Sequence, residues 1–144
     1  MNSNNRASQI GLTRFCIALH ALFWLGQRKC VVPSASIAYE VNLHATVLRK
    51  VMKRLVQAGI VEAKEGRDGG YLLKVQPNKL ALADVYVAMK LDAAEMESTI
   101  NGGESSKKAE VILVELMQEI EGNTIAFLSD YTLADLMNRC DELI

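Results

Sequence analysis

Five polar side chains share one face of a helix predicted over residues 45–58, and their types suit contact with nucleic acid. They are Thr46, Arg49, Lys50, Lys53 and Arg54. The opposite face is apolar at i, i+1, i+4, i+5 and i+8, which is typical of an amphipathic helix. Arginine can read guanine, and threonine can bond a base edge or touch a thymine methyl group. We expect base contacts from His44, Thr46, Arg49 and Lys50, and phosphate contacts from Lys53 and Arg54.

A glycine-rich hairpin follows this helix directly. Strands are predicted over residues 60–64 and 70–75, with Arg67 near the tip between them. Glycines at such a tip allow positive φ angles and a close approach of backbone to phosphate or a groove wall. Candidate DNA contacts here are Arg67, Gly69, Gly70 and Tyr71. A phosphate-cradling loop of a nucleotide enzyme is disfavoured, because such loops join a strand to a helix and carry Gly-Lys-Ser/Thr.

The elements around these residues complete a recognisable unit. A short helix is predicted from Pro33 to Val41, with Ser34 or Ser36 as N-cap and Ser36 as a further candidate DNA contact. A turn over residues 42–44 leads into the basic helix, and Gly59 sits where a left-handed C-terminal glycine belongs. Further helices are predicted over residues 6–26 and 82–89. A helix–turn–helix followed by a hairpin predicts a winged helix-turn-helix DNA-binding domain over residues 1–90.

Charge is divided between the two halves of the chain. Residues 1–80 hold 12 Lys and Arg against 4 Asp and Glu, whereas residues 81–144 hold 4 against 13. A basic half suits a polyanion, since each neutralised phosphate releases counterions. The alternative is that ordinary solvated faces happen to segregate. On the first reading, the acidic half should point away from the nucleic acid.

The second half of the chain predicts dimerisation helices over residues 107–144, after a loop over residues 91–106. A long helix begins at Lys107, and Gly122-Asn123 inside it could bend or end it. Its carboxylates Glu115, Glu119 and Glu121 are expected on the exposed side, and a last helix covers residues 133–143. The long helix has more apolar surface than one small domain can hide, which favours a two-fold dimer. Packing of this helix back onto its own domain is the alternative.

Three phrases carry a resemblance to a known family. They are the run from Leu48 to Val61, the wing Gly66-x-x-Gly69-Gly70-Tyr71-Leu72-Leu73, and Leu82-Ala83-Asp84-Val85. Over about residues 8–90 the chain resembles the Rrf2 family of bacterial transcription regulators, to which IscR, NsrR and CymR belong. The resemblance implies a mainly α fold with a small two-stranded β-wing and a long C-terminal dimerisation helix. It also implies a homodimer that binds palindromic double-stranded operator DNA, usually as a repressor.

Departures from the family pattern bear on both the operator and the sensor. Glu65 precedes the first wing glycine, where relatives often have a basic residue, and Arg49 stands where an acidic residue is common. The resemblance implies three cysteines between the wing-following helix and the dimerisation helix in cluster-binding members, but residues 76–106 contain none. We therefore expect no iron–sulfur cluster and no other cofactor. His20 and His44 lie on separate elements and predict no metal site.

The signal is the open question at this point. Cys30, flanked by Arg28 and Lys29, has the electropositive setting that activates a thiol, so it is the candidate redox sensor. The alternative is that Cys30 has no functional role. Cys16 is expected to be buried and His20 to be a core or interface histidine. A small-molecule effector of unknown identity would use a pocket between the wing-following helix and the long helix.

Other function classes find little support. The sequence offers no Ser/His/Asp, Cys/His or paired-carboxylate set, so we expect no enzyme. Three cysteines without a C-x-x-C motif suit a reducing cytoplasm, and the apolar run over residues 15–26 is too short to span a membrane. The predicted function is a dimeric, sequence-specific DNA-binding regulator that responds to a redox or small-molecule signal. The alternative is a winged-helix protein-interaction module that does not bind DNA, for which Glu65 is the main support.

Overall fold

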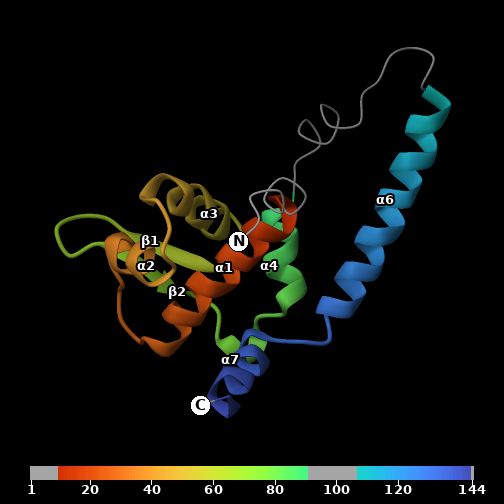
Figure 1. The fold of residues 1–144 in the computed structure, drawn as a ribbon. Helices are drawn as coiled ribbons and strands as arrows, with labels where there is room; N and C mark the ends of the chain where they lie inside the picture. Colours follow the sequence, from red (N-terminus) through yellow and green to blue (C-terminus); the bar gives the residue numbers. More distant parts are fainter. Residues whose placement is uncertain (1–9, 91–106, 144) are drawn as a thin grey trace.

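The computed structural model describes residues 10–90 and 107–143. Residues 6–9 of the first predicted helix and the predicted loop over residues 91–106 lie outside these ranges. In chain order the elements are α1 (Ile10–Gln27), α2 (Ser34–Glu40), α3 (Ala45–Gln57), β1 (Val61–Lys64), β2 (Gly70–Leu73), the 3-10 helix η3 (Pro77–Lys79), α4 (Leu82–Met89), α6 (Lys107–Leu128) and α7 (Leu133–Glu142). The mainly helical fold with one two-stranded antiparallel sheet confirms the predicted fold class (Figure 1). No helix among the described residues is both long and apolar enough to cross a membrane.

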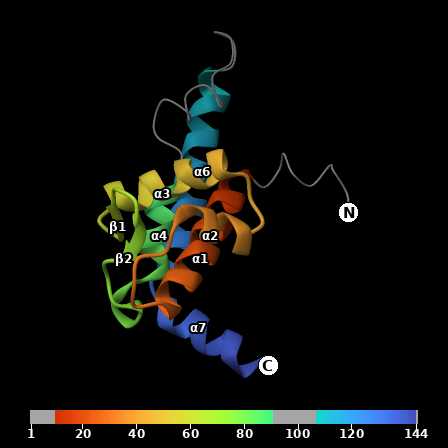
Figure 2. The same cartoon turned by 90° about the vertical axis from the view of Figure 1, so that its left-hand side faces the viewer.

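Helix α1 organises the core. It packs against α3 and α4 and also contacts α2, β2 and α7 (Figures 1 and 2). Ala18 and Ala21 are fully buried, and their small side chains let the neighbouring helices approach closely. Leu22 and Leu25 are buried beside them, and burying each leucine stabilises the fold by about 1.5–3 kcal/mol. The elements that carry the helix–turn–helix are therefore fixed on one central helix.

The helix–turn–helix is built as predicted, apart from its first cap. Pro33 is the N-cap of α2 and no side chain caps the helix, so the predicted role of Ser34 or Ser36 as N-cap is wrong. Proline presets the backbone φ angle at this position without needing a side-chain hydrogen bond. At the other end of the motif, Gly59 has φ +76°. Its N–H bonds the Val56 carbonyl and the Ile60 N–H bonds the Leu55 carbonyl, which is the Schellman pattern that ends α3.

The C-terminal helices attach to the domain at one end only. Thr132 and Asp135 form a capping box that starts α7. The Leu82 N–H bonds the Tyr131 carbonyl and the Leu133 N–H bonds the Leu80 carbonyl, both at 2.9 Å, so the start of α7 is tied to the start of α4. Helix α6 continues through Gly122 to Leu128, so the glycine does not end it. From its lower part, which packs against α4, α6 extends away from the domain (Figure 1).

Helix α6 leaves a broad apolar surface uncovered. The large apolar side chains between 41% and 65% exposed near and along it are Val111, Ile112, Leu113, Leu116, Met117, Ile120, Phe127 and Tyr131. Glu115 and Glu119 are exposed as predicted, but Glu121 is half-buried, because it pairs with Lys90 at 3.5 Å. Helix α6 does pack against α4 of its own domain, but within the described part of the chain this packing does not cover these apolar side chains.

One prediction on α1 is wrong, and a second is wrong in one of its two alternatives. Cys16 was expected to be buried and is exposed, and His20 is likewise exposed, which removes its interpretation as a core histidine. The near-continuous apolar sequence of α1 gave no polar face by which to tell its sides apart. Both side chains are exposed, and their i, i+4 spacing places them on the same face of α1. The interface role predicted for His20 as the alternative stays a prediction.

Candidate DNA-binding surface

The exposed face of α3 gathers basic side chains. Thr46, Arg49, Lys50 and Lys53 are all exposed, and their i, i+3, i+4, i+7 spacing places them on one face. The buried side chains of α3 are Leu48, Val51, Met52 and Leu55. No acidic residue interrupts α3, so the exposed face presents only positive charge. This is the arrangement that an anionic, grooved partner requires.

His44 and Ser36 lie beside this face on the neighbouring segments. His44 is the N-cap of α3 in extended backbone conformation, and its exposed side chain makes no capping hydrogen bond. Its imidazole therefore stays available to a partner at the helix start. Ser36 is exposed in the first turn of α2. Both candidates are therefore on the surface, His44 at the start of α3 and Ser36 at the start of α2.

Arg54 is placed differently from its neighbours on α3. It is half-buried, and its Nη1 donates a hydrogen bond to the Lys90 carbonyl at 3.0 Å. Lys90 in turn pairs with Glu121 of α6. Lys90 thus connects α3 to α6, because its backbone carbonyl accepts from Arg54 and its side chain pairs with Glu121. Sequence reasoning missed this role, since Lys90 and Arg54 are 36 residues apart and no local pattern links them.

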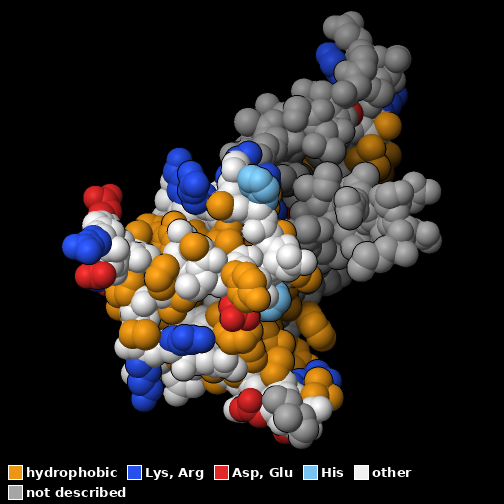
Figure 3. Space-filling model, turned by 60° about the vertical axis from the view of Figure 1, so that its left-hand side comes forward, with side chains coloured by type: hydrophobic (Ala, Val, Ile, Leu, Met, Phe, Trp, Pro, Cys, Tyr) orange, Lys and Arg blue, Asp and Glu red, His pale blue; other side chains and the backbone are white. Residues whose placement is uncertain are grey.

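The wing is a short hairpin with both signs of charge near its tip. Val61 pairs with Leu73 and Lys64 with Gly70, so the tip comprises residues 65–69. Arg67 is exposed there, between the acidic residues Glu65 and Asp68. Figure 3 shows blue and red side chains next to one another on the projecting hairpin at the left. Unlike α3, the wing tip thus presents no net positive charge.

The glycines of the wing have definite geometric roles. Gly66 has φ +102°, in the left-handed region that glycine tolerates best. A Cβ at Gly69 would lie too close to the carbonyl oxygens of Lys64 and Gly66, and one at Gly70 would collide with the Val32 carbonyl. Gly69 and Gly70 therefore serve close packing of the chain on itself. A direct approach of these glycines to DNA stays a prediction.

Val32 adds a third partner to the wing. Its N–H bonds the Tyr71 carbonyl and the Tyr71 N–H bonds the Val32 carbonyl, both at 2.9 Å. The Tyr71 ring is half-buried and packs against the core. The segment between α1 and α2 is thereby joined to β2. The β-branched pair before Pro33 was the only sequence signal for this bridge, and it was missed.

The pocket expected between α4 and the long helix has a counterpart in the structure. A cavity of about 320 Å³ is lined by Phe15, Tyr86, Asn123, Thr124, Phe127 and Leu128. The Phe15 and Tyr86 rings meet edge to face with centroids 5.8 Å apart. Burial, and to a lesser degree the Glu121 carboxylate, raises the pKa of Tyr86 above 10.0. Its hydroxyl therefore stays protonated at neutral pH.

A helix–turn–helix with a basic second helix, followed by a glycine-rich wing, defines the winged helix-turn-helix class of DNA-binding regulators. Residues 12–139 match the Rrf2 family, described as an iron-dependent transcriptional regulator, and the chain belongs to this family. The IscR transcriptional regulator of Serratia proteamaculans is 28% identical over 114 residues, covering 78% of this chain and 68% of the relative. The family and these relatives are transcriptional regulators, which confirms that the chain is not an enzyme.

Solved structures share the fold. IscR of T. potens superposes with a TM-score of 0.66 at 22% identity, covering 91% of this chain and 88% of that one. CymR, the global cysteine regulator of B. subtilis, gives a TM-score of 0.63 at 24% identity and covers 88% and 95% of the two chains. The agreement extends over most of the chain in both cases.

The family description names iron, but the donors of this chain do not fit an iron site. Cys16, Cys30 and Cys140 lie on α1, in the segment after α1, and on α7. Within the described ranges no three His, Cys, Asp or Glu side chains gather where they could hold a metal ion. Residues 91–106 contain neither cysteine nor histidine. Thiolate or imidazole ligation of a cluster thus has no set of donors in this chain.

Proposed function

We propose that the chain is a dimeric transcriptional repressor in the cytoplasm that inserts α3 into the major groove of a palindromic operator. The observation that carries this proposal is the uninterrupted basic face of α3 opposite its buried face. Arg49 reads a base, Thr46 and Lys50 support it, and Lys53 meets a phosphate. Arg54 positions α3 through its bond to the Lys90 carbonyl.

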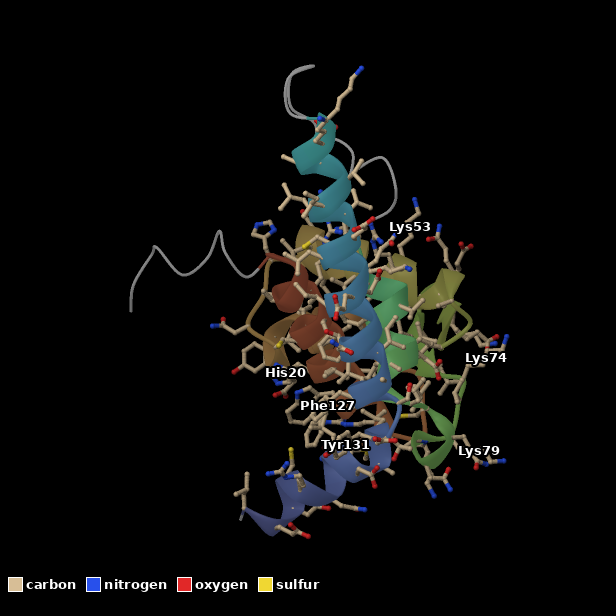
Figure 4. All side chains as sticks on the ribbon, turned by 90° about the vertical axis from the view of Figure 1, so that its right-hand side faces the viewer. His20, Lys53, Lys74, Lys79, Phe127 and Tyr131 are labelled. Atoms are coloured by element: carbon tan, nitrogen blue, oxygen red, sulfur yellow. The ribbon has the colours of Figure 1, made fainter. Side chains whose placement is uncertain are left out.

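A second copy of the chain is the partner that best suits the apolar face of α6. The Phe127 and Tyr131 rings meet at the foot of α6, tilted by 49° with centroids 5.3 Å apart. Figure 4 shows them on the same side as His20, while Lys53, Lys74 and Lys79 lie along the opposite edge. The apolar and basic surfaces are therefore separate, so that a dimer through α6 leaves both copies of α3 free for DNA. Two reading helices related by a two-fold axis match a palindrome.

Fluorescence anisotropy with the duplex upstream of the protein's own gene tests the DNA-binding proposal. Arg49→Ala should weaken binding by about 1–3 kcal/mol, the range for an arginine that reads a base. Arg67→Ala should reduce the slope of log affinity against log salt by about 1 if its wing contact is to phosphate. Arg139→Ala is the matched control, because Arg139 is an exposed arginine on α7, away from α3.

The charge-balanced wing favours one alternative, in which the domain binds a partner protein and no DNA. The anisotropy titration at low salt distinguishes DNA binding from a protein-interaction function. Salt-sensitive binding that both arginine variants weaken and Arg139→Ala preserves supports operator reading. An absence of binding at low salt would refute it and leave the interaction module.

For the signal, we propose oxidation of the exposed Cys30 thiol. A peroxide would transfer one oxygen to the thiolate, forming an S–O bond as the O–O bond breaks and water or an alcohol leaves. Cys30→Ser should then abolish the effect of hydrogen peroxide on DNA affinity. Cys16→Ser is the matched control, since Cys16 is also exposed but lies on α1. Equal peroxide responses in wild type and Cys30→Ser would end this idea.

A further inference from the structure

A second cavity lies beside the helix–turn–helix, and its lining includes Cys30, the proposed site of oxidation, and Ser36, a candidate DNA contact. It measures about 400 Å³, within the range of small-molecule sites. The end of α1, the segment after it and α2 line the cavity, which opens to solvent. Its lining includes Trp24, Arg28, Val31, Ile37 and Glu40. It is separate from the cavity near α6, which borders the apolar face assigned to the dimer.

The lining combines an apolar wall with one charge of each sign. Trp24 and Val31 are half-buried and Ile37 is buried, so they form a surface for an apolar group. Arg28 and Glu40 are exposed and make no ion pair with one another. Both charges therefore remain available to one molecule in the cavity. The Trp24 indole N–H is shielded from solvent and has no acceptor among the described residues, which is costly for a buried donor.

These charges discriminate among ligand classes. A simple carboxylate would meet Arg28 but bring a like charge to Glu40, and a simple amine would do the reverse. A neutral apolar molecule would leave both charges unused. A molecule that carries both a carboxylate and an ammonium group satisfies the two together. The apolar wall then selects its side chain.

We propose that this cavity binds a free α-amino acid with an apolar side chain. Its carboxylate faces Arg28, its ammonium group faces Glu40, and its side chain lies against Trp24, Val31 and Ile37. The site identifies a chemical class of effector for the regulator, and only this regulatory consequence rests on the proposed function.

The floor of the cavity is connected to the wing. Val32 lines the cavity and exchanges both of its backbone hydrogen bonds with Tyr71 of β2. Ser36 and Ile37 of α2 line it as well. A ligand that shifts the segment after α1 would therefore move β2 and α2 together. Both elements belong to the surface proposed to meet DNA.

Intrinsic fluorescence tests the site directly, because Trp24 is the single tryptophan of the chain. L-leucine should change the emission saturably, while N-acetyl-L-leucine and L-leucinamide, each lacking one charge, should bind at least about tenfold more weakly. Isothermal titration calorimetry of the same three probes detects binding even if the ligand does not change the Trp24 emission. Equal binding of all three would overturn the zwitterion assignment. No saturable response by either method to L-leucine, L-isoleucine, L-valine or L-phenylalanine would overturn the site.

Charge-removing variants locate the ligand. Arg28→Gln and Glu40→Gln should each weaken L-leucine binding about tenfold. Lys29→Gln and Glu65→Gln are the matched controls, because both residues are exposed and neither lines the cavity. Controls that weaken binding as much as Arg28→Gln and Glu40→Gln would refute the placement. These titrations use no DNA, so their failure is distinct from failure of operator binding, which anisotropy reports.

Discussion

Glu62 and Lys64 lie two residues apart on β1 and therefore on the same face of the hairpin. Their side chains form a salt bridge of 2.9 Å in an exposed setting. The hydrogen bond and charge of Lys64 hold the pKa of Glu62 below 4.5. A carboxyl with a lowered pKa in the folded state contributes stability above its unfolded pKa and loses it as pH falls through the folded value. Because the pair is exposed, its contribution is small.

The pKa of Glu62 gives a prediction at this scale. Lys64→Gln should return the pKa of Glu62 toward 4.5, because Lys64 supplies the two largest causes of the shift. NMR titration of the side-chain carboxyl measures it. Lys74→Gln is the control and should move the pKa much less, since Lys74 contributes only a minor Coulombic effect. A titration midpoint that Lys64→Gln leaves unchanged would contradict the pairing in solution.

At the scale of single elements, two glycines should respond oppositely to the same substitution. Gly59 ends α3 with φ +76°, and Gly122 lies inside α6. A Cβ at either position would meet nothing within 4 Å, so crowding does not decide the outcome. Gly59→Ala should destabilise by about 1–2 kcal/mol, because alanine is strained in the left-handed region. Gly122→Ala should stabilise by about 0.5–1 kcal/mol, because glycine weakens a helix interior.

Chemical denaturation of the two variants measures both effects, and each variant serves as the control of the other. If both variants lowered the free energy of unfolding, a steric contact of the added methyl group, and not the backbone conformation, would determine the effect at Gly122. A stabilised Gly59→Ala would contradict the Schellman ending of α3.

The sequence predicted local elements well and long-range placements poorly. Helix α4 was predicted with its observed bounds, and the start of α6 at Lys107 was also correct, because periodicity and turn residues are local signals. The left-handed role of Gly59 was likewise readable from its place after an amphipathic run. The exposure of Cys16, by contrast, depends on which side of α1 meets α3 and α4. Such packing is set by tertiary contacts, as are the Arg54–Lys90 bond and the Val32–Tyr71 bridge.

At the scale of the whole molecule, the exposed face of α6 is the test of assembly. Leu116 is 49% exposed in the middle of this face. Leu116→Arg would place a charge at the centre of the proposed interface, where it would be buried without a partner. The variant should sediment as a monomer and lose tight binding to a palindromic duplex. Analytical ultracentrifugation and anisotropy measure the two outcomes.

Gln118→Arg is the matched control for assembly, because it introduces the same charge on an exposed polar position of α6. It should leave the sedimentation coefficient at the dimer value. A Leu116→Arg variant that sediments like wild type would exclude this face as the dimer interface.

The charge balance of the wing tip has a consequence for the search along a genome. Non-operator DNA is held almost wholly by the salt-dependent attraction of cations for phosphates. In the proposed complex, a wing on which Glu65 and Asp68 offset Lys64 and Arg67 adds little to that attraction, and α3 would carry most of it. Dwell times on random sequence should then be short, while base contacts from α3 persist at the operator. The ratio of operator affinity to non-operator affinity, which decides occupancy in the presence of many competing sites, should thereby increase.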